Sequence, residues 1–177
     1  NKAPTILRFG TLFGLSPRMR FDLVINLFVA KAIKEGKITV FGGNQYRPFL
    51  HVSDASDAII FSLEKNLTGT YNVISENLTM KQAAERVSKA TGCKIDISNE
   101  NEDKRSYRVS AEKLKQIGFE PSKTIEDAIN EIKEAIDDGQ ISNYDDAKYS
   151  NYKLLFGSKE MQEKVFIQGI PGSLDVP

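Results

Sequence analysis

The stretch Thr5-Ile6-Leu7-Arg8-Phe9-Gly10-Thr11-Leu12-Phe13-Gly14 opens the alternation of strands and helices that decides the fold of this chain. Its first half, residues 5–9, is rich in β-branched and apolar residues and predicts a buried strand. The glycines at positions 10 and 14, followed by Pro17, predict that this strand runs into an irregular loop. Residues 22–35 then carry apolar side chains at helical spacing, and Gly36 is placed to end that helix.

The same alternation continues along the chain. Further extended segments are predicted at residues 38–41, 47–52, 71–74 and 93–98. Helices are predicted from Ser53 or Asp54 to about residue 66, from the capping-box pair Thr79 and Gln82 to about residue 91, from Ser110 to Gly118, and from Ser122 or Thr124 to about residue 138. Strands that alternate with helices indicate the α/β class.

The C-terminal region differs in composition from the rest. It mixes Asn, Asp, Lys and Ser with a small apolar group, Leu154, Leu155 and Phe156, and it ends in a stretch that contains Gly and Pro. We therefore expect one folded unit over residues 1–138. Residues 139–177 are expected to form a partly irregular tail that packs through a few apolar side chains.

Composition excludes several classes of function. The 177 residues hold 24 Lys and Arg against 24 Asp and Glu, and these charges are scattered, so nothing indicates nucleic-acid binding. No apolar run has the length that a membrane span requires. One His and one Cys, Cys93, nearly exclude a zinc site and exclude an internal disulfide, so we expect no metal and a cytoplasmic protein.

Single residues indicate chemistry only weakly. His51 has neither a metal-ligand partner nor an evident nucleophile, which favours a structural role. The Gly42-Gly43 pair lacks the spacing of a phosphate-binding loop, so a plain turn is favoured. Arg47 precedes Pro48, which biases its backbone toward extended geometry, and its planar fork suits a diphosphate; an ordinary surface or ion-pair role is the alternative.

Two Tyr-x-x-x-Lys matches occur, at Tyr144/Lys148 and Tyr149/Lys153. On a helix this spacing places a phenol and an ammonium on one face, where the cation can lower the phenol pKa. Chance matches are expected in a chain so rich in Tyr and Lys, and both pairs lie after every predicted strand. A catalytic role for either pair is therefore disfavoured.

Several motifs in fixed order together resemble one family. The chain resembles the C-terminal half of an extended short-chain dehydrogenase/reductase, of the NAD-dependent epimerase/dehydratase group that acts on nucleotide-diphosphate sugars. The matching stretches are Leu-Arg-Phe-Gly-Thr-Leu-Phe-Gly (7–14), Arg-Met-Arg-Phe-Asp-Leu-Val-Ile-Asn (18–26), Val-Phe-Gly-Gly (40–43), Arg-Pro-Phe-Leu-His-Val-Ser-Asp (47–54), Gly-Thr-Tyr-Asn-Val (69–73) and Asp-Lys-Arg-Ser-Tyr-Arg-Val-Ser (103–110).

This resemblance implies the end of a Rossmann-type doubly wound sheet followed by a small α/β substrate-binding lobe. It also implies that NAD or NADP is bound mainly by an N-terminal half that precedes residue 1, where the glycine fingerprint and the catalytic Tyr and Lys are expected. No catalytic residue is then expected among these 177, and the fragment alone is expected to be inactive. Other expected partners are a nucleotide-diphosphate sugar and, at full length, a second copy in a homodimer.

The resemblance assigns site residues by position. Phe9 and Gly10 are expected to approach the nicotinamide, and Thr11 the sugar. The diphosphate is expected at the start of the first helix, near Asp22, Leu23 and Asn26. Some family members carry Asn at the position of Asp22, and here Arg18 or Arg20 is expected to offset the Asp22 charge. The remaining substrate contacts are expected from Thr39 and Phe41 at the nucleobase, Arg47 at the diphosphate, Asp103 and Tyr107 at the ribose or sugar, and Arg105 at a phosphate.

Two other interpretations stay open. A reductase of the same superfamily would act on a different carbonyl substrate. A non-catalytic binding module would reuse the fold without the chemistry, since fold does not determine function.

Overall fold

The computed structural model describes residues 3–100 and 103–156. Its strands are β1 (Thr5–Phe9), β2 (Thr11–Phe13), β3 (Lys37–Phe41), β4 (Tyr46–His51), β5 (Gly69–Val73), β6 (Glu76–Thr79) and β7 (Lys94–Ser98). The helices are α1 (Val24–Glu35), α2 (Val52–Glu64), α3 (Met80–Thr91), α4 (Glu112–Lys115), α5 (Ile125–Asp137), the 3-10 turn η1 (Ala147–Tyr149) and α6 (Asn151–Phe156).

Three small sheets hold the strands, and most of the pairing is parallel. β1 pairs with β5 and β3 with β7, both in parallel register. In the third sheet β4 lies between β2, to which it is parallel, and β6, to which it is antiparallel. Because helices alternate with strands that pair mostly in parallel, the predicted α/β class is confirmed.

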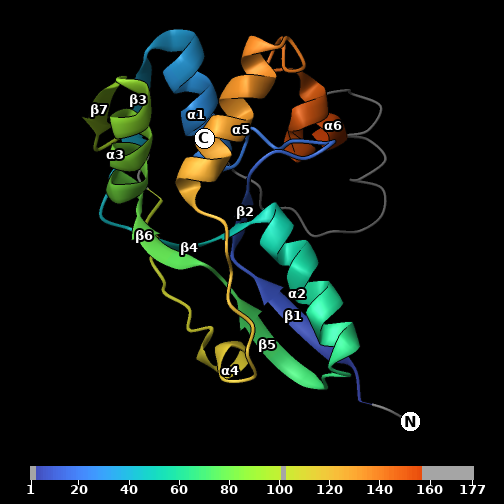
Figure 1. The fold of residues 1–177 in the computed structure, drawn as a ribbon. Coiled ribbons are helices and arrows are strands. Elements are labelled where there is room, and N and C mark those ends of the chain that lie inside the picture. Colours follow the sequence, from blue (N-terminus) through green and yellow to red (C-terminus); the bar gives the residue numbers. More distant parts are fainter. Residues whose placement is uncertain (1–2, 101–102, 157–177) are drawn as a thin grey trace.

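Two apolar cores lie at opposite ends of the molecule. Helices α1, α3 and α5 pack together beside β3 and β7 around the larger core, which includes Phe28, Ile38 and Ile132 (Figure 1). The smaller core lies where α2 and α4 flank β1 and β5, and it includes Leu50 and Val73. The central β2–β4–β6 sheet joins the two ends and positions the loops between them.

Several element boundaries agree with the sequence, and others required correction. The Thr79/Gln82 capping box of α3 is present, and Thr124 caps α5. The stretch from Gly10 to Gly14 is not wholly irregular, because residues 11–13 form β2 against β4. This short strand has too few residues to show a period, and its partner lies almost 40 residues further along the chain.

The start of α2 also differs from the prediction. The helix begins at Val52 and its N-cap is His51, whose ring nitrogen accepts a hydrogen bond from the Ser53 N–H. Asp54 is buried instead, and its carboxylate accepts from the backbone N–H groups of Ser122 and Lys123 at 2.8 and 3.1 Å. It therefore ties α2 to the segment before α5 rather than capping its own helix.

Ile141 and Tyr149, which were not predicted to do so, connect residues 139–156 to the larger core, and of the predicted apolar group the structure describes only the side chain of Leu154. Ile141 is 3% exposed and Tyr149 is 8% exposed, and both belong to that core, whereas Leu154 is 45% exposed. The predicted boundary at residue 138 stays a prediction, and the irregularity expected over residues 157–177 lies outside the described residues. No helix in the described part of the chain is long and apolar enough to cross a membrane.

Candidate functional site

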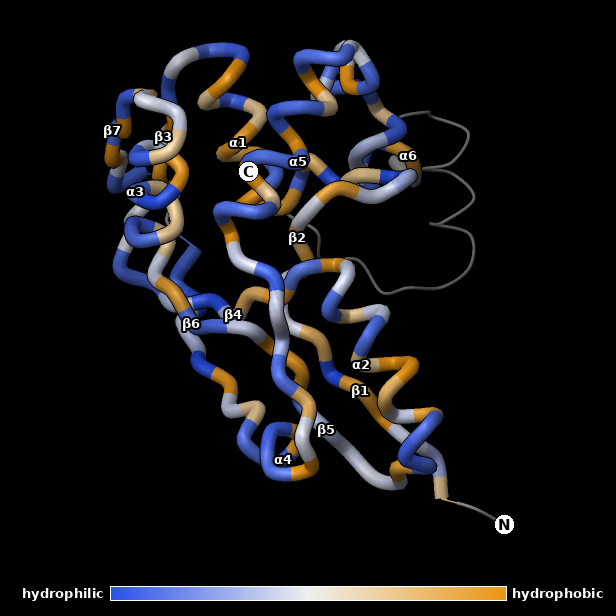
Figure 2. Tube along the Cα trace, in the orientation of Figure 1, coloured by the Kyte–Doolittle hydropathy of each residue, from blue (hydrophilic) through white to orange (hydrophobic). Residues whose placement is uncertain are grey.

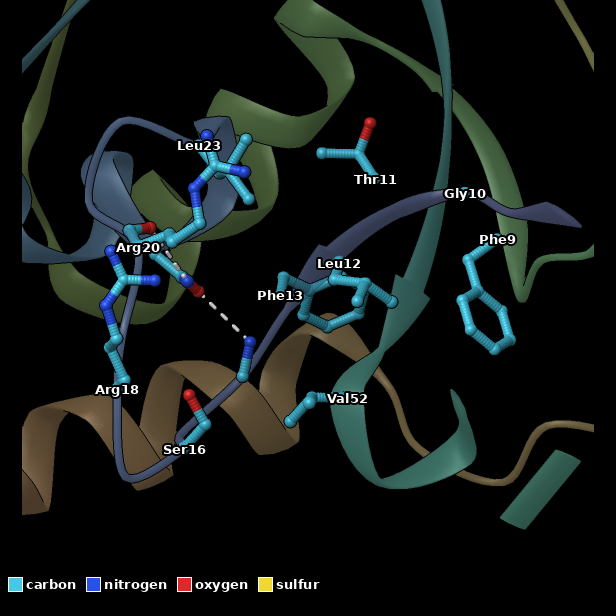
Figure 3. A pocket seen from close by; sticks show the side chains of 12 residues that line it. Phe9, Gly10, Thr11, Leu12, Phe13, Ser16, Arg18, Arg20, Leu23 and Val52 are labelled. Carbon is cyan, nitrogen blue, oxygen red and sulfur yellow. Dashed lines mark hydrogen bonds between the residues drawn. The ribbon is translucent and has the colours of Figure 1, made fainter. Parts of the chain in front are cut away.

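A cavity of about 400 Å³ opens where β1 passes into β2 (Figure 3). Its walls are the end of β1, strand β2, the loop that follows, and the first turn of α1. The predicted residues Phe9, Gly10, Thr11, Leu23 and Asn26 all line it. This position matches the rule that ligands of open α/β sheets bind beyond the carboxyl ends of parallel strands.

The first turn of α1 reaches this cavity without a side-chain cap. Leu23 occupies the N-cap position and makes no capping hydrogen bond. A helix N-terminus presents backbone N–H groups and the positive end of the helix dipole, which favours anions. The Asn26 amide is engaged within the chain, because its Oδ1 accepts from the Gly14 N–H at 3.0 Å and its Nδ2 donates to the Arg20 carbonyl at 3.1 Å.

Two arginines stand beside this helix start. Arg18 and Arg20 line the cavity on the same side (Figure 3), and Arg20 holds Asp22 through two hydrogen bonds of 3.0 and 2.8 Å. Asp22 itself does not line this cavity. Burial opposes its ionisation, but the hydrogen bonds from Arg20 keep the pKa of its carboxyl below the usual value. Arg20 thus balances the charge of Asp22. The sequence predicted that either Arg18 or Arg20 would do so.

A second cavity, of about 550 Å³, shares Phe9, Gly10 and Thr11 with the first. Tyr107 lines it, as do Arg8 and Arg108, which sequence reasoning missed. Both lie inside stretches quoted for the resemblance, residues 7–14 and 103–110, so the motif was visible although their roles were not. None of the described residues that line the two cavities is acidic.

Arg47 forms a third group with three other predicted residues. Its Nη2 donates to the Asp103 carboxylate at 2.7 Å, and its Nη1 donates to the carbonyls of Tyr46, at 2.9 Å, and Arg105. Its guanidinium lies 5.3 Å from the ring centre of Tyr107. Hydrogen bonds from Arg105, together with those from Arg47, hold the pKa of Asp103 well below its usual value.

Thr39 and Phe41, predicted at the nucleobase, lie on β3 and line neither of these two cavities. Phe41 is 47% exposed, and its carbonyl accepts a hydrogen bond of 2.7 Å from Gln45. This hydrogen bond stabilises the turn between β3 and β4, next to the Arg47 group. The Phe41 ring stays accessible to solvent.

His51 has the structural role that its isolation in the sequence favours. It is fully buried, its Nε2 lies 3.1 Å from a Glu131 carboxylate oxygen, and its ring packs edge-on against Phe13. The same Glu131 oxygen accepts from the Leu15 N–H at 3.2 Å. His51 and Glu131 thus hold the loop that borders the first cavity.

Neither Tyr-x-x-x-Lys pair forms a catalytic arrangement. Tyr144 precedes η1 and donates to Glu35, which raises the pKa of its phenol to about 12, the opposite of activation. Tyr149 is buried, and Lys153 pairs with Asp145 at 2.6 Å. Within residues 3–100 and 103–156, no group of three or more His, Cys, Asp or Glu side chains is placed to hold a metal ion.

Comparison with known proteins shows which family and which enzymes this chain is similar to. Residues 2–74 match the NAD dependent epimerase/dehydratase family. UDP-glucuronic acid decarboxylase 3 of Arabidopsis thaliana is 33% identical over 124 residues, which cover 65% of this chain and 36% of the plant protein. The chain thus spans little more than a third of the length of this curated relative.

Solved structures share the fold of the described chain. The dTDP-glucose 4,6-dehydratase of Bacillus anthracis, in complex with NAD, is 26% identical with a TM-score of 0.64, covering 77% of this chain and 45% of its own. The UDP-glucose 4-epimerase of Thermus thermophilus, also with NAD, is 23% identical with a TM-score of 0.61, covering 74% and 47%. The fold is therefore that of part of a Rossmann-type extended short-chain dehydrogenase/reductase, and residues 2–74 are similar to the NAD-dependent epimerase/dehydratase family.

Proposed function

We propose that this chain is the substrate-binding portion of an NAD- or NADP-dependent nucleotide-sugar epimerase or dehydratase and binds the nucleoside diphosphate of the sugar. The observation that carries the proposal is that arginines line both cavities at the end of β1 and that a further one, Arg47, lies beside a residue of the second cavity. Arg18 and Arg20 line one cavity beside an uncapped helix start, Arg8 and Arg108 line the adjoining one, and Arg47 lies against Tyr107. Guanidinium groups and helix N-termini are the groups that proteins use to bind phosphates.

The names of the similar proteins support the same ligand class. They refer to UDP-glucuronic acid, UDP-glucose and dTDP-glucose, in which a sugar is joined to a nucleoside diphosphate. A diphosphate placed near the arginines leaves the sugar toward the strand end that both cavities share. Thr11 lines both cavities there, so we assign its hydroxyl to the sugar.

The end of β1 accommodates the nicotinamide of the cofactor. Phe9 is 37% exposed at the cavity edge, which leaves an apolar ring for a flat ligand. A Cβ at Gly10 would lie only 3.0 Å from the Pro48 carbonyl oxygen and from Ile74, so glycine permits the close packing at this point. When bound, the nicotinamide would supply hydride transfer from and to the sugar carbon.

One face of the described structure is suited to the NAD-binding segment that this proposal requires. β1 pairs on one edge with β5, and the described chain places no strand on its other edge. Beside it, α2 exposes three large apolar side chains: Ile59, Ile60 and Leu63 are 46, 53 and 71% exposed. Figure 2 shows apolar residues in orange along this helix. A helix that is apolar on both sides is typically buried on both sides. We assign this face to the NAD-binding sheet and the catalytic Tyr and Lys of the same enzyme.

The roles of the present residues follow from this arrangement. Arg18, Arg47 and the start of α1 neutralise and orient the diphosphate, while Arg20 balances the charge of Asp22 beside them. This anchoring fixes the sugar relative to the reacting groups. His51 and Glu131 act indirectly by holding the loop at residues 14 and 15. Binding energy from the nucleotide thereby positions the sugar, so the sugar itself needs few contacts with the protein.

Substitution of Arg47 tests this proposal. In the intact gene product, Arg47→Ala is expected to weaken binding of UDP or dTDP by about 1.5–3 kcal/mol, the scale of a hydrogen bond to a charged group. Isothermal titration calorimetry measures this directly.

Arg86→Ala is a suitable control, because Arg86 lies on α3, lines neither cavity and pairs with Glu76 and Glu126. Its nucleotide affinity is expected to equal that of the parent. If Arg47→Ala and the parent bind both nucleotides equally well, Arg47 is not part of the site.

A further inference from the structure

One carboxylate is shared by two arginines next to the proposed diphosphate site. Asp103 Oδ2 lies 2.7 Å from Arg47 Nη2 and 2.7 Å from Arg105 Nη2. Arg105 also donates to Asp103 Oδ1 from its Nε at 2.9 Å and from its backbone N–H at 3.1 Å. The three side chains together carry a net charge of +1, so the group attracts an anion even while Asp103 is in place.

Arg47 is the rigid member of this group. Its side chain is 11% exposed, and its Nη1 is committed to two backbone carbonyls, those of Tyr46 and Arg105. The guanidinium carbon of Arg47 lies over the Tyr107 ring, 5.3 Å from its centre. The Nη2 that points to Asp103 is therefore the part of the fork that can exchange a partner without loss of the backbone contacts.

Arg105, in contrast, is an exposed side chain that can keep Asp103 after such an exchange. Its side chain is 79% exposed, and Asp103 is 40% exposed. If Asp103 leaves Arg47, it retains the side-chain and backbone hydrogen bonds of Arg105, and water satisfies its remaining lone pairs. No buried carboxylate is left unpaired, so the exchange avoids the large cost of an isolated charge.

We propose that Asp103 occupies, on Arg47, the position that a phosphate of the ligand takes, and that the ligand displaces it onto Arg105. This inference rests on the proposed function, in which Arg47 binds the diphosphate. Asp103 then competes with the ligand for Arg47. Only an anion that carries more negative charge than a single carboxylate displaces it. The site thereby selects a diphosphate over a monoanion of similar size.

The exchange differs measurably from the role that the family resemblance implies for Asp103. A carboxylate that holds the ribose or sugar contributes hydrogen bonds to a nucleotide, and an anion without a ribose does not use those hydrogen bonds. A carboxylate that competes for Arg47 weakens binding of any phosphate, including inorganic pyrophosphate. The two roles therefore predict different results for pyrophosphate when Asp103 is neutralised.

The test is calorimetric titration of inorganic pyrophosphate into the intact gene product and its Asp103→Asn variant. Asn keeps an acceptor oxygen for both guanidinium groups but removes the competing charge. Pyrophosphate affinity is expected to rise about five- to tenfold, the effect of removing one like charge from a half-exposed contact. The matched control is Glu120→Gln, which removes one exposed charge from the pair with Lys115 and is expected to change affinity less than about twofold.

Unchanged or weaker pyrophosphate binding by Asp103→Asn overturns the exchange. The Arg47→Ala variant separates this failure from failure of the proposed function. If Arg47→Ala weakens pyrophosphate binding while Asp103→Asn leaves it unchanged, only the exchange is wrong. If Arg47→Ala binds pyrophosphate as the parent does, or if the parent binds none, both proposals are overturned.

Discussion

His51 illustrates what a single residue reveals before the fold is known. Its isolation from other metal ligands and nucleophiles favours a structural role, and the structure confirms that role. Its partner Glu131 is 80 residues away and was not predictable, because that contact depends on how α5 packs beside β4. Gly14 completes the arrangement: its φ is +102°, and a Cβ there would lie 2.3 Å from His51 Nε2. The chain therefore needs glycine at the bend.

Tyr144 gives a pH-dependent prediction at the same scale. Its hydrogen bond to Glu35 raises the pKa of the folded phenol to about 12, above the ordinary value of 10.0. The folded state then holds a proton that the unfolded state releases between about pH 10 and pH 12, so stability falls as pH rises through that interval. The contribution of Tyr144 is complete below pH 10 and is lost above pH 12.

Urea unfolding of the parent and Tyr144→Phe at a series of alkaline pH values measures this effect. Subtracting the variant from the parent isolates Tyr144 from the other tyrosines and lysines. The difference in unfolding free energy is expected to fall between about pH 10 and pH 12. A difference that is constant across this interval would show that the phenol titrates normally.

At the scale of elements, local signals predicted the helices better than the short strands. The Thr79/Gln82 capping box of α3 and the glycine at the end of α1 fall where the sequence places them. β2 and β6 were missed, because strands of three and four residues have no period to detect and form only against β4. These two strands matter for the site, since β2 forms one wall of the first cavity.

The capping box of α3 can be tested by stability. Thr79→Ala removes the side-chain oxygen that accepts from the Gln82 N–H and is expected to lower the free energy of unfolding by about 1 kcal/mol. Urea denaturation followed by circular dichroism measures the change. The control is Ser56→Ala, on the exposed side of α2, where the hydroxyl bonds to the Val52 carbonyl. That change is expected to be neutral or slightly stabilising, because Ala is the better helix former. Equal losses in both variants would contradict a specific capping role.

For the whole molecule, the segment after α5 belongs to the larger core. The Ile141 N–H donates to the Ala135 carbonyl at 3.0 Å, and the Phe21 N–H donates to the Tyr149 carbonyl at 3.1 Å. Phe21 and Tyr149 also meet edge-on with ring centres 5.2 Å apart. The chain that follows α5 therefore closes over the loop that leads into α1 and the first cavity.

Truncation of Ile141 tests whether this closure stabilises the fold. Ile141→Ala leaves a cavity in the core and is expected to cost about 2–5 kcal/mol of unfolding free energy. Leu154→Ala, at a half-exposed position, is expected to cost less than about 1 kcal/mol. Thermal and urea denaturation distinguish the two. Similar small losses would show that residues 139–156 pack only loosely against the core.

Local patterns in the chain were sufficient for the α/β class, most helix boundaries and the structural role of His51, because periodicity, caps and glycines act over a few neighbouring residues. The quoted motifs also indicated the family. Three features followed only from the assembled molecule. Thr11 lines both cavities, Arg8 and Arg108 line the second one, and Arg47 and Arg105 share Asp103. Each of these joins residues tens of positions apart, and such contacts depend on how strands and helices pack rather than on any local preference.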